Sequence, residues 1–251
     1  MKTTRFDTNR YEFNPDSRKG CYIIHGFTST TYETRELAEF LGENGFHTVT
    51  ENLPGHATTS QECNRVKYQD WLSFIDRKVA EFSTECDELY VVGMSMGGVL
   101  AMYAADLFPL KAVVAAASVF RFADHYKLKF FNSILCSLFP MQSKLSSYHK
   151  SFRDNLIFFG YKEYPMKALN EFRKMNKLVL QKLNNISCPA LIMHAENDKT
   201  SMEININLIT DRIGSEKISV KRYAHASHNI FIQSDDQKQI FQDILIHLNT
   251  V

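Results

Sequence analysis

The most informative part of the chain is Gly93-Met94-Ser95-Met96-Gly97, which follows the apolar run Glu88–Val92 and precedes the small-residue stretch Gly98–Ala105. The first flank is typical of a buried strand and the second of a helix. A serine on a sharp strand-to-helix turn occupies a strained position, and glycines two residues away on each side let strand and helix close around it. The context therefore predicts a nucleophile elbow centred on Ser95.

The composition limits the classes of protein to consider. A chain of 251 residues with 44% hydrophobic content and a net charge of +1 can form one substantial core, and we expect a single domain over residues 1–251. The near-neutral charge gives no support to nucleic-acid binding. Five scattered cysteines without close spacing argue against a disulfide framework or a zinc site. With a polar N-terminus and no long apolar run, we predict a cytoplasmic protein without stable membrane insertion.

Apolar runs alternate with amphipathic segments along most of the chain. We predict one short edge strand at Tyr11–Phe13. The other expected strands are Cys21–Ile24, His47–Asn52, the run before Ser95, Lys111–Ala117, Ala190–His194 and Lys217–Arg222. The expected helices are Thr34–Asn44, Tyr68–Phe82, the stretch after Ser95, Glu203–Ile213 and Gln237–Leu248. This alternation is typical of an α/β fold, with a mostly parallel sheet covered by helices on both faces.

One segment interrupts the alternation. No convincing strand is visible from about residue 120 to about residue 184, and the composition changes toward Phe, Tyr, Leu, Lys and Asn. A segment this long inside an α/β domain favours a helical insertion over a loop.

Two later loops contain the partners that a catalytic serine needs. A serine hydroxyl requires a base, normally histidine, which a carboxylate orients, in the chain order Ser, Asp or Glu, His on such an elbow. The loop after the strand at 190–194 contains Glu196 and Asp198, and the loop after the strand at 217–222 contains His225 and His228. We favour Asp198, because its shorter side chain suits a tight contact with histidine. We favour His228 because the chain turns there toward the last helix, with Glu196 and His225 as the alternatives.

The reaction also needs backbone donors for the developing oxyanion. The N–H of Met96, directly after the serine, is one expected donor. The second is the N–H of Phe27 in the turn His25-Gly26-Phe27, where Gly26 allows close approach. For His25 itself we expect a structural side chain that holds the loop by hydrogen bonds.

Several motifs resemble the α/β-hydrolase superfamily. They are His25–Ser29, Arg35–Leu41, Leu53–His56, Gly93–Gly98 and Ala226–Ile230. The sequence looks most like the small cytoplasmic bacterial carboxylesterases and monoacylglycerol lipases, and the likeness covers most of the chain except the first 18 residues and the insertion. This resemblance implies the α/β-hydrolase fold, with a small helical cap inserted after the sixth core strand, at about residues 120–184. It also supports His228 as the catalytic histidine.

Two positions depart from the pattern of that family. Ala57 stands where Leu-Pro-Gly-His is usually followed by glycine. Thr200 and Ser201 follow Asp198 where an apolar residue is common.

The resulting hypothesis is a serine carboxylic-ester hydrolase that acts through an acyl-enzyme. We expect lipophilic short- to medium-chain esters, including monoacylglycerols, because aromatic and aliphatic pairs in the insertion suit an acyl pocket. These pairs are Phe130-Phe131, Ile134-Leu135, Leu138-Phe139 and Leu156–Phe159. We expect a small-molecule ester as the substrate, no cofactor or metal, and a monomer or homodimer. The alternatives are the same catalytic residues acting on an amide, thioester or carbon–carbon bond, or a non-catalytic binding protein of the same fold.

Overall fold

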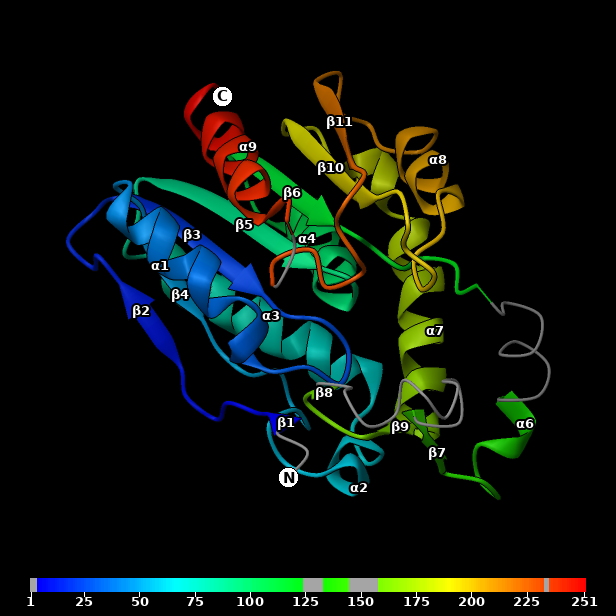
Figure 1. Cartoon of the computed structure of the whole chain (residues 1–251). Helices are drawn as coiled ribbons and strands as arrows, with labels where there is room; N and C mark the ends of the chain where they lie inside the picture. Colours follow the sequence, from blue (N-terminus) through cyan, green and yellow to red (C-terminus); the bar gives the residue numbers. More distant parts are fainter. Residues whose placement is uncertain (1–3, 124–132, 145–157, 233–234) are drawn as a thin grey trace.

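A sheet of seven strands forms the centre of the protein, in the order β11-β10-β6-β5-β3-β4-β2 (Figure 1). The computed structural model describes residues 4–123, 133–144, 158–232 and 235–251. In chain order the strands of this sheet are β2 (Tyr11–Phe13), β3 (Lys19–Ile24), β4 (His47–Thr50), β5 (Glu88–Met94), β6 (Ala112–Ala116), β10 (Ala190–Ala195) and β11 (Ile218–Tyr223). The edge strand β2 runs antiparallel to β4, and the other pairings are parallel.

The central strands are apolar on both faces because both faces are buried. Successive side chains of a strand point to opposite sides, so Tyr22 and Ile24 of β3 belong to one hydrophobic core and Ile23 belongs to the other. Val91 and Val92 of β5 divide in the same way. This arrangement explains why the strands read as continuous apolar runs and confirms the predicted mostly parallel, covered sheet.

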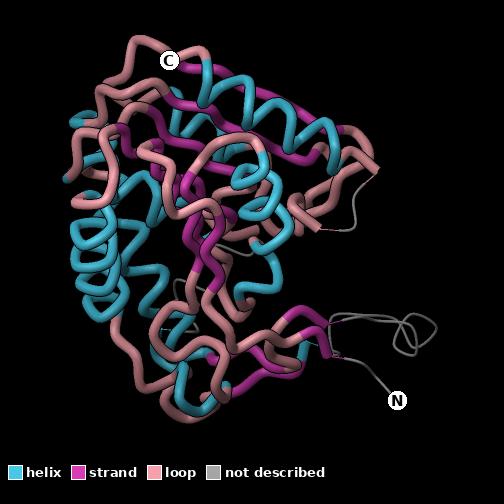
Figure 2. The backbone as a smooth tube through the Cα atoms, turned by 90° about the vertical axis from the view of Figure 1, so that its left-hand side faces the viewer, coloured by secondary structure: helices cyan, strands magenta, loops and turns pink. Residues whose placement is uncertain are grey.

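Helices cover both faces of the sheet (Figures 1 and 2). The longer helices are α1 (Arg35–Glu43), α3 (Tyr68–Ser83), α4 (Met96–Leu107), α7 (Met166–Leu180), α8 (Ile204–Thr210) and α9 (Gln237–Asn249). Buried residues of α3, α4, α7 and α8 contribute to one core, and those of α1 and α9 to the other. The helices predicted from periodicity are therefore present, with ends that differ from the prediction by at most three residues.

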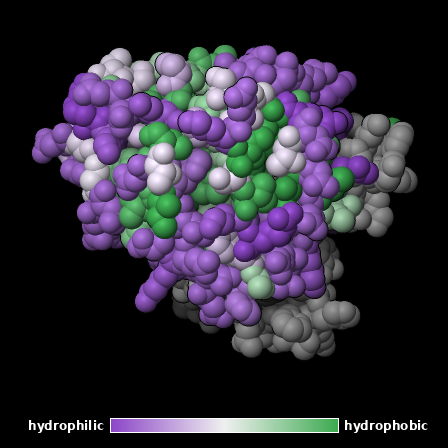
Figure 3. Space-filling view, turned by 90° about the horizontal axis from the view of Figure 1, so that it is seen from above, coloured by the Kyte–Doolittle hydropathy of each residue, from purple (hydrophilic) through white to green (hydrophobic). Residues whose placement is uncertain are grey.

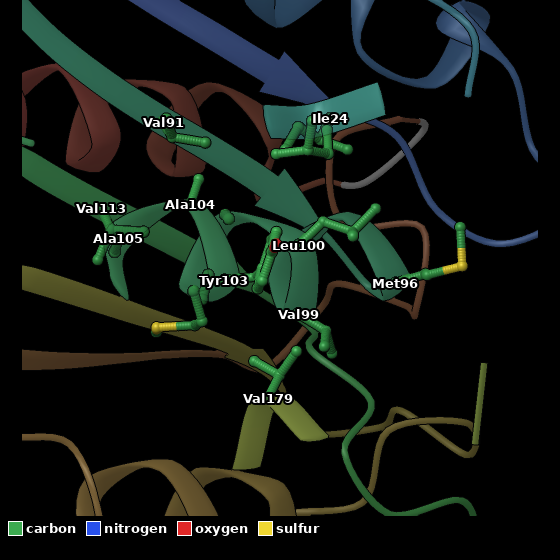
Figure 4. Close-up of a cluster of buried hydrophobic side chains, with 14 of the residues drawn as sticks. Ile24, Val91, Met96, Val99, Leu100, Tyr103, Ala104, Ala105, Val113 and Val179 are labelled. Carbon is green, nitrogen blue, oxygen red and sulfur yellow. The ribbon is translucent and has the colours of Figure 1, made fainter. Parts of the chain in front are cut away.

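Helix α4 is the most deeply buried helix of the described chain and directly follows Ser95. Every residue from Met96 to Ala105 is buried. In Figure 4, α4 lies between Ile24 and Val91 of the sheet on one side and Val179 of α7 on the other. Close packing around this helix fixes the position of the turn at its N-terminus.

The segment between β6 and β10 contains more than helix. Its described part includes α6 (Ser133–Leu135) and α7, but β7 (Met141–Ser143) also pairs antiparallel with β9 (Glu163–Pro165). A further short strand, β8 (Phe158–Phe159), pairs with β1 (Thr4–Arg5) near the N-terminus. The expectation that this segment has no strand is therefore wrong. Strands of two or three residues are too short to show an alternating pattern.

Three further short elements complete the described structure: the 3₁₀ helices η1 (Thr31–Glu33) and η4 (Leu183–Asn185), and the helix α2 (Ser60–Cys63). Seen from above, the surface is mainly hydrophilic, with hydrophobic side chains gathered near the centre of the view (Figure 3). Within the described residues, no helix has both the length and the hydropathy needed to cross a bilayer.

Candidate active site

Ser95 occupies a sharp turn at the carboxyl end of β5, immediately before α4. Its backbone is strained, with φ 56° and ψ −113°, and its N–H donates to the carbonyl of Ala116 at 2.8 Å. A methyl group on Gly93 would collide with the carbonyl of Gly97, and one on Gly97 would collide with the carbonyl of Ile24. Both glycines are therefore required for the strand and helix to approach each other, as the motif predicts.

Three separate segments place a serine, a histidine and a carboxylate in one chain of hydrogen bonds. His228 follows β11, and its Nε2 lies 3.0 Å from Oγ of Ser95. The other ring nitrogen, Nδ1, lies 2.7 Å from Oδ2 of Asp198, in the loop after β10. A carboxylate only accepts hydrogen bonds, so Nδ1 is the protonated nitrogen and Nε2 presents its lone pair to the serine. The arrangement suits proton transfer from Ser95 to His228.

Asp198 is held in a fixed orientation within its loop. Its side chain is fully buried, and Oδ1 accepts the backbone N–H groups of Thr200 at 2.7 Å and Ser201 at 2.9 Å. The two residues that depart from the family pattern thus supply backbone donors to the carboxylate. Glu196, the alternative acid, is exposed, and its backbone N–H bonds to the carbonyl of Tyr223.

His225, the alternative base, lies on the outside of the same loop as His228. Its side chain is exposed, and its backbone N–H donates to Oδ2 of Asp236 at 2.8 Å. No hydrogen bond joins its ring to Ser95 within the described residues. His228 is therefore the histidine that is placed to take the proton of Ser95.

The turn at His25-Gly26-Phe27 lies against Ser95. A methyl group on Gly26 would come within 3.2 Å of Cβ of Ser95. The backbone N–H of Phe27 has no acceptor among the described residues. Met96 is the first residue of α4, and N–H groups in the first turn of a helix have no intrahelical acceptor. Both expected donors are therefore available beside the serine.

His25 holds this turn in place, as expected from the sequence. Its Nδ1 bonds to the carbonyl of Gly26 at 2.9 Å, and its Nε2 accepts the N–H of Leu53 at 3.0 Å. Complete burial lowers the pKa of His25 to about 4, which keeps the ring neutral in this pattern of one donor and one acceptor.

A buried carboxyl group that the sequence analysis did not single out lies beside the same turn. Glu33 ends η1, is 2% exposed, and accepts the N–H of Gly26 at 2.7 Å. Burial raises its pKa to about 7. A lone glutamate in a polar stretch has no sequence signal that distinguishes it from a surface residue.

The segment between β6 and β10 contacts the turn at Thr28, one residue after Phe27. Nζ of Lys144 donates to Oγ1 of Thr28 at 2.6 Å, and the N–H of Tyr161 donates to the Thr28 carbonyl at 3.0 Å. Burial lowers the pKa of Lys144 to about 8. A methyl group on Gly160 would collide with the Thr28 carbonyl. These residues dock the inserted segment on the turn that faces Ser95.

The hydrophobic pairs that we expected to line an acyl pocket do not line one where the structure describes them. Ile134, Leu138 and Phe139 are exposed at 73%, 72% and 67%, so they neither pack against the core nor enclose a pocket. The pair Phe130-Phe131 and the residues Leu156-Ile157 lie outside the described residues, and Phe158–Phe159 form β8.

One group of possible metal ligands lies elsewhere in the described chain. Glu12, His47 and Glu85 bring one ligand atom each within 4.8 Å of one another. His47 is the first residue of β4, at the opposite end of the parallel strands from Ser95. Glu12 already pairs with Arg10 at 2.6 Å and with His47 at 2.7 Å, which accounts for its position without an ion.

Solved structures of lipolytic enzymes share this architecture. The metagenome-derived lipolytic enzymes LipS and LipT are represented by a chain with 23% identity and a TM-score of 0.84, over 97% of this chain and 98% of the other. A monoacylglycerol lipase from Paleococcus ferrophilus aligns with 15% identity and a TM-score of 0.76, over 97% of this chain and 99% of the other. The protein has the α/β-hydrolase fold.

The family assignment comes from the sequence. Residues 15–235 match the family described as serine aminopeptidase, S33, and the chain belongs to that family. A thermostable monoacylglycerol lipase of Bacillus sp. (strain H-257) is 25% identical over 83% of this chain and 82% of its own. A carboxylesterase of Bacillus subtilis (strain 168) is 21% identical over 90% of each chain.

Proposed function

We propose that this protein is a serine ester hydrolase in which Ser95 is the nucleophile, His228 the general base and Asp198 the group that orients the histidine. The observation that carries the proposal is the continuous pair of hydrogen bonds, 3.0 Å from Ser95 to His228 and 2.7 Å from His228 to Asp198, on a strained turn. The names of the two bacterial relatives, a monoacylglycerol lipase and a carboxylesterase, favour an ester as the bond that is cleaved.

The reaction proceeds in two halves. His228 Nε2 takes the proton of Ser95 Oγ while the oxygen attacks the ester carbonyl, and the protonated histidine then gives this proton to the departing alcohol. A water molecule, deprotonated in turn by His228, attacks the acyl-enzyme and releases the carboxylic acid. Asp198 stabilises the protonated ring through Nδ1 and holds it in the required tautomer.

The oxyanion of each tetrahedral intermediate accepts hydrogen bonds from the N–H groups of Phe27 and Met96. The second donor lies at the N-terminus of α4, where the helix dipole adds favourable charge. Donors that are already oriented need no reorganisation when the charge develops.

For the substrate we propose lipophilic esters of short to medium chain length, including monoacylglycerols. We also propose that residues 1–251 form one α/β-hydrolase domain and that about residues 120–184 form its cap. The contacts of Lys144 and Tyr161 with Thr28 support a cap position over the turn. The cytoplasmic location and the monomeric or homodimeric state expected from the sequence belong to this proposal too.

Hydrolysis of p-nitrophenyl esters from acetate to palmitate tests the function directly. Wild-type protein should hydrolyse these esters, and Ser95→Ala should lower kcat by about 10⁴-fold or more with an unchanged melting temperature, because a triad member is lost. Each added CH₂ in an acyl pocket contributes up to about 0.8 kcal/mol, so kcat/KM should rise toward medium chain lengths and then level.

Aminoacyl p-nitroanilides belong in the same panel, because the family description names aminopeptidases. Faster turnover of these amides than of any ester would move the assignment to peptide-bond chemistry with the same three residues. A Ser95→Ala variant with more than a tenth of wild-type turnover would contradict the assigned nucleophile.

A further inference from the structure

Glu33 lies beside the turn that faces Ser95 and has no part in the mechanism above. Its Oε2 accepts the Gly26 N–H at 2.7 Å. A methyl group on Gly26 would lie 3.1 Å from that oxygen and 3.2 Å from Cβ of Ser95. The carboxyl group, the turn and the nucleophile therefore meet in one small volume.

The carboxyl group of Glu33 forms no salt bridge with the part of the chain that the structure describes. Among the described residues, no lysine, arginine or histidine nitrogen lies within 4.0 Å of it. A buried carboxyl group is costly when no cation pairs with it, and burial raises the pKa of Glu33 to about 7. The hydrogen bond from Gly26 lowers this pKa, as do His228, Ser29 and Lys144. Burial of this carboxyl group therefore costs folding free energy that an apolar residue at position 33 would not cost. What Glu33 adds to the structure is its hydrogen bond to the Gly26 N–H.

The two neighbours of Phe27 are both anchored, each by a different segment of the chain. Glu33 holds the N–H of Gly26 from the core. Lys144 and the N–H of Tyr161 hold Thr28 from the inserted segment. Phe27 lies between these anchors, and its own N–H is left free among the described residues. The Phe27 N–H lies in the peptide plane that begins at Cα of Gly26, so its direction depends on the position of Gly26. The carbonyl in that same plane accepts Nδ1 of His25 at 2.9 Å and the N–H of Ser29 at 3.2 Å, and Glu33 fixes Gly26 at its N–H.

We infer that Glu33 is a positioning residue, which aims the Phe27 N–H at the oxyanion by holding the Gly26 N–H. The inference rests on the proposed function. Glu33 makes no hydrogen bond to Ser95 or His228, so it acts through the turn and takes no part in proton transfer. A displacement of about 1 Å in such a group can cost about 10²-fold in rate.

Two conservative variants separate the effect of side-chain length at position 33 from the effect of its charge. Glu33→Gln keeps the length and the accepting oxygen but removes the charge. Glu33→Asp keeps the carboxyl group but withdraws it by one C–C bond, about 1.5 Å. The matched controls are Glu43→Gln and Glu43→Asp, at an exposed position at the end of α1.

We expect Glu33→Gln to stay within about threefold of the wild-type kcat. Glu33→Asp should lose at least about tenfold in kcat with KM changed less than about twofold, because the lost interaction acts in the transition state. A trifluoromethyl ketone, whose adduct with Ser95 carries an oxyanion, should bind Glu33→Asp more weakly by a similar factor. Binding of the carboxylic acid product should change less than about twofold in all four variants.

Three results would overturn the inference: a Glu33→Asp variant with wild-type kcat, a Glu33→Gln variant that loses as much as Glu33→Asp, or a loss that appears in KM alone. Failure of the proposed function is distinguishable, because wild-type protein and both Glu43 variants would then also lack Ser95-dependent ester hydrolysis.

Discussion

At the scale of single residues, each of the two loops that supply the acid and the histidine contains a pair of similar side chains, and the backbone decides which one points inward. In the loop after β10, the N–H groups of Thr200 and Ser201 turn Asp198 toward His228 while Glu196 remains exposed. In the loop after β11, His228 reaches Ser95 while the exposed His225 is bonded through its backbone to Asp236. Position after the strand limited each choice to two residues. Side-chain length then favoured Asp198, and the turn toward the last helix together with the family resemblance favoured His228.

The two histidines should differ sharply when they are replaced. His228→Ala should lower kcat on a p-nitrophenyl ester by about 10³-fold or more, because Ser95 loses its base. His225→Ala should stay within about threefold of wild type. The double variant with Ser95→Ala should be little worse than either single one, since residues that act as a unit are not additive. The reverse ranking of His225 and His228 would contradict the assigned base.

Glu33 shows what the sequence could not reveal. The nucleophile elbow, the acid and the histidine can be predicted from local motifs and chain order. The role of Glu33 cannot, because it depends on the chain folding so that the Glu33 side chain contacts the Gly26 N–H. A contact of that kind leaves no spacing pattern in one sequence. The same holds for Lys144, which reaches Thr28 from 116 positions further along the chain.

At the scale of elements, the strand–turn–helix unit around Ser95 depends on close backbone approach. The long strands and helices were predictable because each has a periodic apolar pattern of sufficient length. The short pairs β1–β8 and β7–β9 were not, since two or three residues carry no period.

Gly97→Ala should therefore destabilise the protein strongly. The added methyl group would collide with the carbonyls of Ile24 and His25, which cannot move without shifting β3 and the turn. We expect a loss of about 3 kcal/mol or more in the free energy of unfolding, measured with urea. The control Gly45→Ala has open space around it and a φ of +95°, so it should cost only about 1–2 kcal/mol. Equal losses in the two variants would contradict the packing of the elbow.

At the scale of the whole molecule, the fold buries histidines in neutral form, and this links stability to pH. Burial lowers the pKa of His25 to about 4 and that of His56 to about 3, against about 6.5 in an unfolded chain. Their contribution is complete above pH 6.5 and is lost as the pH falls toward the folded-state pKa values. Glu33 acts in the opposite direction, because its raised pKa favours folding below pH 4.5 and that gain is lost as the pH rises through 7.

His56→Phe isolates one of these contributions. The ring of His56 packs near Phe27, Trp71 and Tyr161, and its Nδ1 makes a 3.2 Å contact with the carbonyl of Pro54. Between pH 7 and pH 5, wild type should lose about 2 kcal/mol more in unfolding free energy than the variant. Urea unfolding at both pH values measures this difference. A variant with the same pH dependence as wild type would show that His56 is protonated in the folded protein.

The central claim is that Ser95 is the activated nucleophile of a serine hydrolase, and labelling with a fluorophosphonate tests it most directly. Peptide mass spectrometry should find one phosphonyl group per chain on Ser95, with ester hydrolysis lost in proportion to labelling. Ser95→Ala should remain unlabelled, and His228→Ala should react far more slowly, because the serine has lost its base. Hydrolytically active protein that remains unlabelled, or that carries the phosphonyl group on another residue, would contradict the account.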